Sequence, residues 1–201
     1  MTVTRRFALS SCLALAMIGA SAPPAASAVD PAEAEAFVRD LVNRMVEIVK
    51  TADSSNTRVD EVMELIEEST AIEDIARFTM GPNWRRMSEA QKDEFIEAFE
   101  RYAARVYVNR LGDYDGQTVE ITGAKDVGRK GVLVTSVLRS PGSDPINLEW
   151  LVNDRNGPVQ LVDLVAEGVS LSISQREEFA AMVEKRGGDI DAFIEDLDTL
   201  G

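Results

Sequence analysis

The sequence predicts an α+β fold in which helices cover one face of a curved antiparallel sheet of about four strands. Three observations support this prediction. Apolar residues recur every three or four positions through the N-terminal half of the chain, which is typical of amphipathic helices. From residue 118 the interval falls to two, which indicates strands. Short turns join the successive strands, and they favour an antiparallel meander because parallel strands need long crossover connections.

The first half of the chain begins with three predicted helices. The first opens at Asp30 and Pro31, where the aspartate can cap the helix, the proline fits its first turn and Glu33 completes a capping box. A second, short helix follows over 59–66, and a third covers 72–80 and ends at a Gly-Pro pair. The apolar stripe of the first helix comprises Phe37, Val38, Leu41, Val42, Met45, Val46 and Val49.

The fourth helix is the most strongly marked. Ser88 and Gln91 form a capping box at its start, and Gly112 ends it. Its broad apolar face comprises Phe95, Ile96, Phe99, Tyr102, Val106 and Tyr107.

The predicted strands cover residues 118–123, 131–139, 146–152 and 158–168, separated by the turn signals GRKG, SPGSDP and DRNG. Two helices close the chain. One is expected to start at Ser174, with Glu177 three residues later, and the other covers residues 189–200. The chain has no internal repeat, and we expect residues 29–201 to form a single domain.

Residues 1–28 have the pattern of an export signal. Arg5 and Arg6 precede an apolar run that is too short to span a bilayer, and the small residues Ala26 to Ala28 fit a cleavage site. We expect cleavage after Ala28 and export from the cytoplasm. A general secretory signal and a twin-arginine signal are both compatible with the arginine pair. Lipidation at Cys12 is disfavoured because most of the apolar run follows that cysteine.

Composition excludes several classes of function. The chain has no histidine and one cysteine, Cys12, which leaves with the signal. Triads based on histidine or cysteine and metal sites built from imidazole or thiolate are therefore excluded, and we expect no cofactor and no metal. The formal net charge is −14, and it becomes −16 once Arg5 and Arg6 are removed. Such a chain should be repelled by nucleic acid and by anionic membranes.

Two groups of charged residues are candidates for chemistry. Asp163 lies within an apolar strand, where a carboxylate could act as a general base; the alternative is that it pairs with an arginine or caps a turn. Six arginines gather in one segment of this acidic chain, and they could form an anion-binding patch or pair with nearby glutamates at helical spacing. They are Arg77, Arg85, Arg86, Arg101, Arg105 and Arg110.

Two long blocks of the sequence resemble the MlaC family of periplasmic lipid carriers, also called the toluene-tolerance family. The first block covers 75–114 and the second begins at 162 with VDLVAEGVSL. The motifs of the first block are Met80-Gly81, Trp84-Arg85, Ser88 with Gln91, Phe95 with Phe99, and Tyr107 with Arg110. Arg176 and Phe179 follow the second block, and RGGDIDAFIEDL completes it. The chain departs from the family pattern at Val159, Val162 and Gln175, where aromatic residues are usual.

This resemblance implies a non-enzymatic carrier that shuttles phospholipid between the outer and inner membranes through the periplasm. It implies an NTF2-like or cystatin-like sheet, with acyl chains held in an apolar cavity between sheet and helices. The implied partners are an outer-membrane lipoprotein–porin complex and an inner-membrane lipid transporter with a lipid-binding ring, and we expect a monomer. A hopanoid or other apolar lipid is an alternative cargo. Other functions left open are an enzyme that uses Asp163 on a small apolar substrate and a chaperone-like adaptor that binds only proteins.

We assign the residues of the implied site as follows. Trp84, Arg85 and Arg86 are expected at the rim of the cavity or at a partner-docking surface. The expected cavity lining comprises Phe95, Phe99, Tyr102, Val106, Val132, Val134, Leu138, Leu148, Trp150, Leu161, Val165, Phe179 and Met182.

Overall fold

The computed structural model describes residues 29–111 and 115–200, with the side chains of 110 and 111 left aside. Within these residues it contains helices and an antiparallel sheet, so the predicted α+β class is confirmed. The predicted export signal, residues 1–28, lies outside the described residues. No helix in the described ranges is long and apolar enough to cross a membrane.

The helices of the first half begin where capping side chains place them. Asp30 precedes α1 (Pro31–Thr51), and its carboxylate accepts a hydrogen bond from the Ala32 amide at 2.8 Å. Ser54 caps α2 (Ser55–Ser69), which is therefore longer at both ends than predicted. As predicted, α3 covers Ile72–Met80, and a short 3-10 helix, η1 (Gly81–Arg86), follows it.

Gly81 ends α3 for a geometric reason. Its φ angle is +53°, a region that favours glycine, and a Cβ atom there would lie 2.9 Å from Nε of Arg176. The capping box that begins α4 (Glu89–Leu111) is confirmed in both directions. The Gln91 amide donates to Ser88 Oγ at 3.2 Å, and the Ser88 amide donates to Gln91 Oε1 at 2.9 Å.

The sheet is a meander in which each strand pairs antiparallel with the next, in the order β1-β2-β3-β4-β5. The long strands are β1 (Thr118–Asp126), β2 (Val132–Arg139), β3 (Ile146–Asn153) and β4 (Gln160–Ala166), with the 3-10 turn η2 (Gly128–Lys130) before β2. A two-residue strand, β5 (Val169–Ser170), adds a fifth member to the roughly four expected. The register of β3 and β4 shifts at Val162, which forms a bulge.

The last two helices are α5 (Leu171–Lys185) and α6 (Ile190–Leu197), which Asp189 caps. The prediction that α5 begins at Ser174 is wrong by about one turn. Ser170 is the cap, because its Oγ accepts from the Ile173 amide at 3.2 Å, whereas the Ser174 hydroxyl donates back to the Ser170 carbonyl within the first turn.

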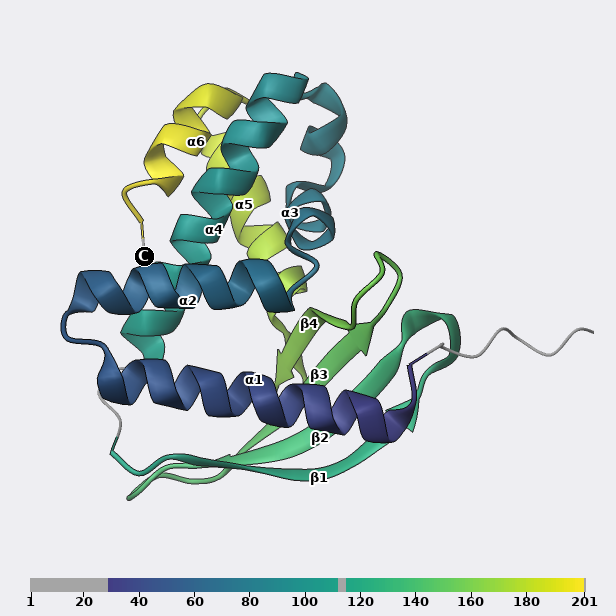
Figure 1. The fold of residues 1–201 in the computed structure, drawn as a ribbon. Coiled ribbons are helices and arrows are strands. Elements are labelled where there is room, and N and C mark those ends of the chain that lie inside the picture. Colours follow the sequence, from purple (N-terminus) through teal and green to yellow (C-terminus); the bar gives the residue numbers. More distant parts are fainter. Residues whose placement is uncertain (1–28, 112–114, 201) are drawn as a thin grey trace, which may run out of the picture.

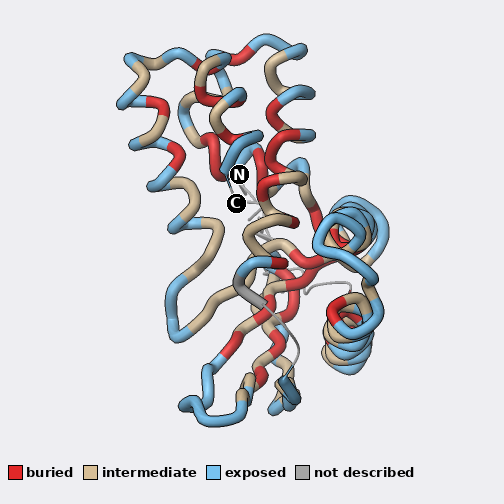
Figure 2. The backbone as a smooth tube through the Cα atoms, turned by 90° about the vertical axis from the view of Figure 1, so that its left-hand side faces the viewer, coloured by how far each residue is buried: buried red, intermediate tan, exposed pale blue. Residues whose placement is uncertain are grey.

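The helices form two groups around the sheet (Figure 1). Helix α1 lies across β1 and β2, and α2 packs against both α1 and α4. Helices α3 to α6 pack together above the β4 end of the sheet. Figure 2 shows buried residues along the strands and on the inward sides of the helices. Three apolar clusters result: one among α3–α6, one between α1 and the sheet, and one between α2 and α4.

Candidate functional site

An apolar cavity of about 460 Å³ lies between the sheet and the helices. Residues from α1 to α5 and from β1 to β4 line it, so its walls come from all three apolar clusters. Its volume falls within the roughly 300–1,000 Å³ that small-molecule sites occupy. The chain therefore surrounds a space that its own side chains leave open.

Part of the lining expected from the sequence is found in these walls. The expected residues that line the cavity are Phe99, Tyr102, Val106, Leu138, Leu148, Trp150 and Leu161. Those that lie elsewhere are Phe95, Val132, Val134, Val165, Phe179 and Met182.

The residues that lie elsewhere do so for identifiable reasons. Phe95 and Phe179 are fully buried in the α3–α6 cluster, where each packs against Phe193 with ring centroids 6.0 and 5.1 Å apart, and Met182 packs against the same cluster. Val132 and Val134 are 0% exposed beneath α1. Val165 pairs with Glu149, next to Trp150 in β3, and therefore stands on the opposite face of the sheet from Trp150.

One wall of the cavity comes from α1 and α2, which contribute no residue to the lining expected from the sequence. Helix α1 contributes a stripe that begins at Leu41, and α2 contributes Leu65 and Ile66. The sequence signal was present, since the apolar stripe of the first helix is broader than packing against one neighbour requires. The lining residues of α1 are Leu41, Val42, Met45, Val46 and Val49.

Several polar groups of the cavity wall are hydrogen-bonded within the protein itself. The Tyr102 hydroxyl donates to Gln175 Oε1 at 3.2 Å, and Gln175 Nε2 donates to Glu178 Oε2 at 3.1 Å. The hydroxyls of Thr70 and Thr79 each donate to a carbonyl of their own helix at 2.8 Å. Because these donors are already used, the wall offers a guest mainly apolar contact.

Asp163 caps α5. Its Oδ2 accepts from the Ser170 hydroxyl at 2.6 Å, and its Oδ1 accepts from the amides of Ser172 at 3.2 Å and Leu164 at 3.0 Å. A carboxylate at a helix N-terminus is favoured by the helix dipole as well as by these bonds. The structure therefore gives Asp163 the capping role that was the alternative to a catalytic one.

Trp84 fixes the corner between α3 and α4. Its ring meets Phe95 edge-on at a centroid distance of 6.4 Å, and Lys92 Nζ lies 5.6 Å from the ring centroid. Trp84 and Arg85 line a second, open groove of about 680 Å³ beside the cavity. Arg86 lies away from the groove lining and donates to Asn83 Oδ1 at 3.2 Å.

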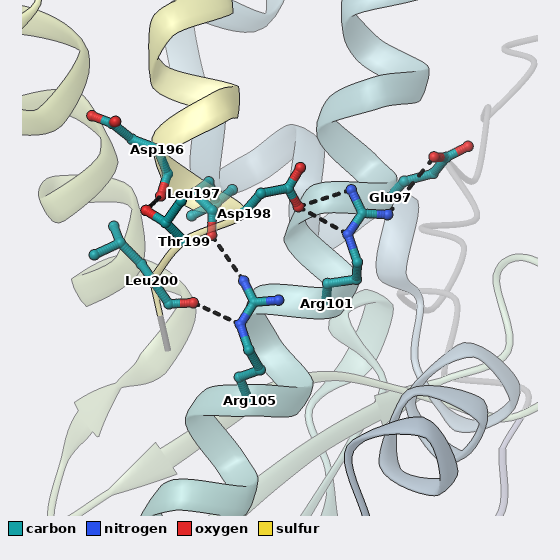
Figure 3. A network of polar contacts seen from close by, with 8 residues as sticks. All are labelled: Glu97, Arg101, Arg105, Asp196, Leu197, Asp198, Thr199 and Leu200. Atoms are coloured by element: carbon teal, nitrogen blue, oxygen red, sulfur yellow. Dashed lines mark hydrogen bonds and ion pairs between the residues drawn. The ribbon is translucent and has the colours of Figure 1, made fainter. Parts of the chain in front are cut away.

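Two of the other arginines tie α4 to the C-terminal helix (Figure 3). Arg101 lies 2.8 Å from Asp198 and 3.8 Å from Glu97. Arg105 donates to the carbonyls of Leu197 at 2.9 Å and Leu200 at 2.8 Å, where α6 ends. These arginines are structural, whereas Arg77 lines the open groove and the side chain of Arg110 lies outside the description.

No group of three or more histidine, cysteine, aspartate or glutamate residues within 29–111 and 115–200 is arranged to hold a metal ion.

Comparison with known proteins gives relatives over most of the chain. The model of the family described as MlaC protein matches residues 39–199. The intermembrane phospholipid transport system binding protein MlaC of Haemophilus influenzae is 23% identical over 114 residues, which cover 55% of this chain and 53% of that protein. The toluene tolerance protein ttg2D of Pseudomonas putida is 23% identical over 112 residues, which cover 55% of this chain and 52% of that protein. The chain thus spans about half the length of the curated relatives it matches.

A solved structure has the same fold. A phospholipid-binding protein of Ralstonia solanacearum, determined in complex with a phospholipid, matches with a TM-score of 0.70 at 22% identity, over 83% of this chain and 95% of that one. The fold agrees with the family match, which covers residues on every wall of the cavity. The chain belongs to the MlaC family.

Proposed function

We propose that this protein is a carrier that shuttles phospholipids between the outer and inner membranes, with their acyl chains held in the cavity between the sheet and the helices. The observation that supports this most is the apolar cavity of about 460 Å³, whose walls combine α1, α2 and α4 with the strands. The names of the relatives point the same way, since one belongs to an intermembrane phospholipid transport system and one was solved with a phospholipid.

The energetics of lipid transfer explain why a carrier needs such a cavity. Each methylene moved from water into apolar surroundings gains about 0.8 kcal/mol, so two acyl chains of about fifteen methylenes each amount to about 24 kcal/mol. A lipid therefore cannot cross water at a useful rate without shielding. A carrier must nevertheless hold the lipid about as well as a bilayer does. If it binds the lipid far more weakly, loading fails, and if it binds far more tightly, release fails. Mainly apolar walls, in which several polar groups are already bonded within the protein, meet both requirements.

The sequence supports a periplasmic setting for this function. The predicted signal at 1–28 and the net charge of −14 suit a protein that diffuses through the periplasm without adhering to anionic membranes. Within the proposal, the donor and acceptor are an outer-membrane lipoprotein–porin complex and an inner-membrane transporter with a lipid-binding ring.

Native mass spectrometry of protein purified without detergent tests the proposal. We expect a mass increment equal to one phospholipid, and extraction with solvent should release that lipid. Recovery of a hopanoid would identify a different cargo and would still support the carrier function. Protein that is recovered without lipid, and that takes up none from phospholipid vesicles after delipidation, would contradict the proposal.

The proposed carrier function includes no catalytic step. A substitution at Asp163 distinguishes this function from that of an enzyme that uses the Asp163 carboxylate. In Asp163→Asn the Ser170 hydroxyl and the Ser172 amide lose a charged acceptor, so we expect a loss of about 1 kcal/mol in stability with lipid loading retained. An enzyme that used this carboxylate as a base would instead lose turnover by orders of magnitude.

A further inference from the structure

The open groove beside the cavity has a charge opposite to that of the protein. Its lining includes five cationic side chains and two carboxylates, a net of +3, in a chain whose formal net charge is −14. The cations come from α3, η1, η2, α5 and the turn after β3, so they converge from separate parts of the chain. They are Arg77, Arg85, Lys130, Arg155 and Arg176.

These cations are not used in ion pairs. Among the residues that the structure describes, none of the five has a carboxylate oxygen within 4.0 Å, the limit for a salt bridge. Cations elsewhere behave differently: Arg44 lies 2.5 Å from Glu68, and Arg101 lies 2.8 Å from Asp198. The groove therefore holds positive charge that the protein leaves available to an anion.

The two carboxylates in the groove already have partners. Asp163 accepts from Ser170, Ser172 and Leu164 at the N-terminus of α5. Asp74 accepts from Asn156 Nδ2 at 3.1 Å. Neither partner is a cation. Two of the five cations have uncharged partners: Arg155 donates to the Arg129 carbonyl, and Arg176 lies 5.1 Å from the ring centroid of Phe78. The charge of the groove is therefore not neutralised by ion pairs within the part of the protein that the structure describes.

The groove and the apolar cavity are adjacent. Four residues line both of them: Ile75 of α3, Val162 and Asp163 of β4, and Ser172 of α5. Val162 is the bulged residue of β4, at which the pairing with β3 is interrupted. By contrast, among the described residues that line the cavity itself, the only charged ones are the carboxylates Asp163 and Glu178. Apolar space thus adjoins cationic space, and these four residues lie at their common boundary.

We infer that the groove receives the phosphate of the lipid whose acyl chains occupy the cavity. This inference rests on the proposed function and adds the position and charge preference of the head group. Arginine matches the geometry of phosphate oxygens, and several cations around one anion add to its attraction. Phe78 and Ile173, which are 40% and 51% exposed in the groove, are placed to contact the apolar region between phosphate and tails.

The same arrangement favours lipids with net negative charge. A glycerol head group brings only its phosphate charge into the groove. A choline head group also brings a cation, which the groove repels. We expect phosphatidylglycerol to be loaded in preference to phosphatidylcholine.

The position of the phosphate is tested by phosphorus NMR with a spin label. The chain has a single cysteine, Cys12, so Cys12→Ser gives a background for one label at Ile173→Cys in the groove. The matched control is Ser140→Cys, at the other end of the cavity where β2 ends. Each protein is loaded from phosphatidylglycerol vesicles. We expect the label at 173 to broaden the lipid phosphorus signal several-fold more than the label at 140, and ascorbate reduction of the label to reverse the effect.

The charge preference is tested with substitutions. Arg77→Gln, Arg85→Gln and Lys130→Gln are combined and loaded from vesicles with equal amounts of phosphatidylglycerol and phosphatidylcholine. The matched control combines Arg39→Gln, Lys125→Gln and Lys185→Gln, which are exposed cations outside the groove. We expect the preference for phosphatidylglycerol to fall about two- to fivefold per charge removed from the groove, and to be unchanged in the control.

Each other outcome is decisive. Stronger broadening from position 140 than from position 173, with lipid loaded, overturns the inference and leaves the carrier function intact. Broadening of added inorganic phosphate by the label at 173, without broadening of the lipid phosphorus, assigns the groove to free phosphate and also overturns it. Unchanged lipid selection in the groove variant, with slower delivery to a partner protein, assigns the groove to docking. Failure to load any lipid contradicts the proposed function itself.

Discussion

The indole Nε1 of Trp150 donates a hydrogen bond to Oγ of Ser136 at 2.8 Å, across the buried face of β2 and β3. Ser136 is 2% exposed and Trp150 is 9% exposed, so the bond is buried. Trp150 lines the cavity, and this bond satisfies its only polar atom. The ring can therefore present an apolar surface to a guest.

Ser136→Ala is expected to lower the free energy of unfolding by about 1–3 kcal/mol, because the buried indole N–H loses its acceptor. Urea denaturation followed by circular dichroism measures the change. Ser143→Ala, at an exposed turn position, is the control and should stay within about 0.5 kcal/mol of the original protein. Equal effects of the two substitutions would show that the bond contributes nothing.

Leu138→Trp is expected to abolish lipid loading without unfolding the protein, because the larger side chain projects into open cavity space. Val137→Trp is the matched control, since the neighbouring residue points to the opposite face of the same strand. Native mass spectrometry reports the bound lipid, and circular dichroism reports the fold. Equal lipid occupancy in both variants would contradict the assignment of this wall. Val134→Trp is a poorer test, because Val134 is fully buried and overpacking there costs about 1–3 kcal/mol.

The fold could be predicted from the sequence because its signals are local. The capping box of Ser88 and Gln91 and the Gly-Pro pair after Met80 fix helix ends through nearest neighbours. The start of α5 differs from the prediction because Ser174 has Glu177 three residues later and so matches a capping box, whereas Ser170, the actual cap, has Ile173 at that position. The choice between them depends on Asp163, a partner seven residues before Ser170 that the turn brings back.

The site was predicted less completely than the fold. Periodicity identifies which residues are buried, but a filled core and an open cavity have the same period. Phe95 and Phe99 lie one turn apart on α4 and look equivalent in the sequence, yet Phe95 is enclosed by other aromatic rings while Phe99 also reaches the cavity. That difference depends on the placement of α5 and α6, which the sequence alone did not provide.

Arg105→Lys is expected to loosen the C-terminal helix, because lysine cannot bond the carbonyls of Leu197 and Leu200 with one planar group. We expect a stability loss of about 1–2 kcal/mol. Hydrogen exchange should be faster in α6 than in the original protein and unchanged in the sheet. Uniform acceleration throughout the chain would contradict a local role for this arginine.

The stability of the fold is expected to depend on pH through the carboxyl group of Glu100. Burial raises the pKa of this carboxyl, and the nearby Glu67 and Glu97 raise it further. Between its ordinary pKa and the raised one, the folded state binds more protons than the unfolded state, so stability falls as pH rises through that window. Above the raised pKa, the charged carboxylate therefore destabilises the fold.

Glu100→Gln is accordingly expected to raise the melting temperature at neutral pH. The gain should shrink as the pH is lowered through the raised pKa, where the carboxyl of the original protein becomes neutral. Glu94→Gln, at an exposed position of the same helix, controls for the change in net charge. A gain that is the same at all pH values, or equal in the control, would contradict this assignment.

Fluorescence quenching by brominated lipid tests most directly whether acyl chains enter the cavity. The chain has two tryptophans, so Trp84→Phe leaves Trp150, in the cavity wall, as the only one. Loading with a phospholipid brominated along its acyl chains should quench Trp150 strongly, whereas the same lipid without bromine should not. Lipid that binds with its normal occupancy and leaves Trp150 unquenched would show that the chains lie elsewhere.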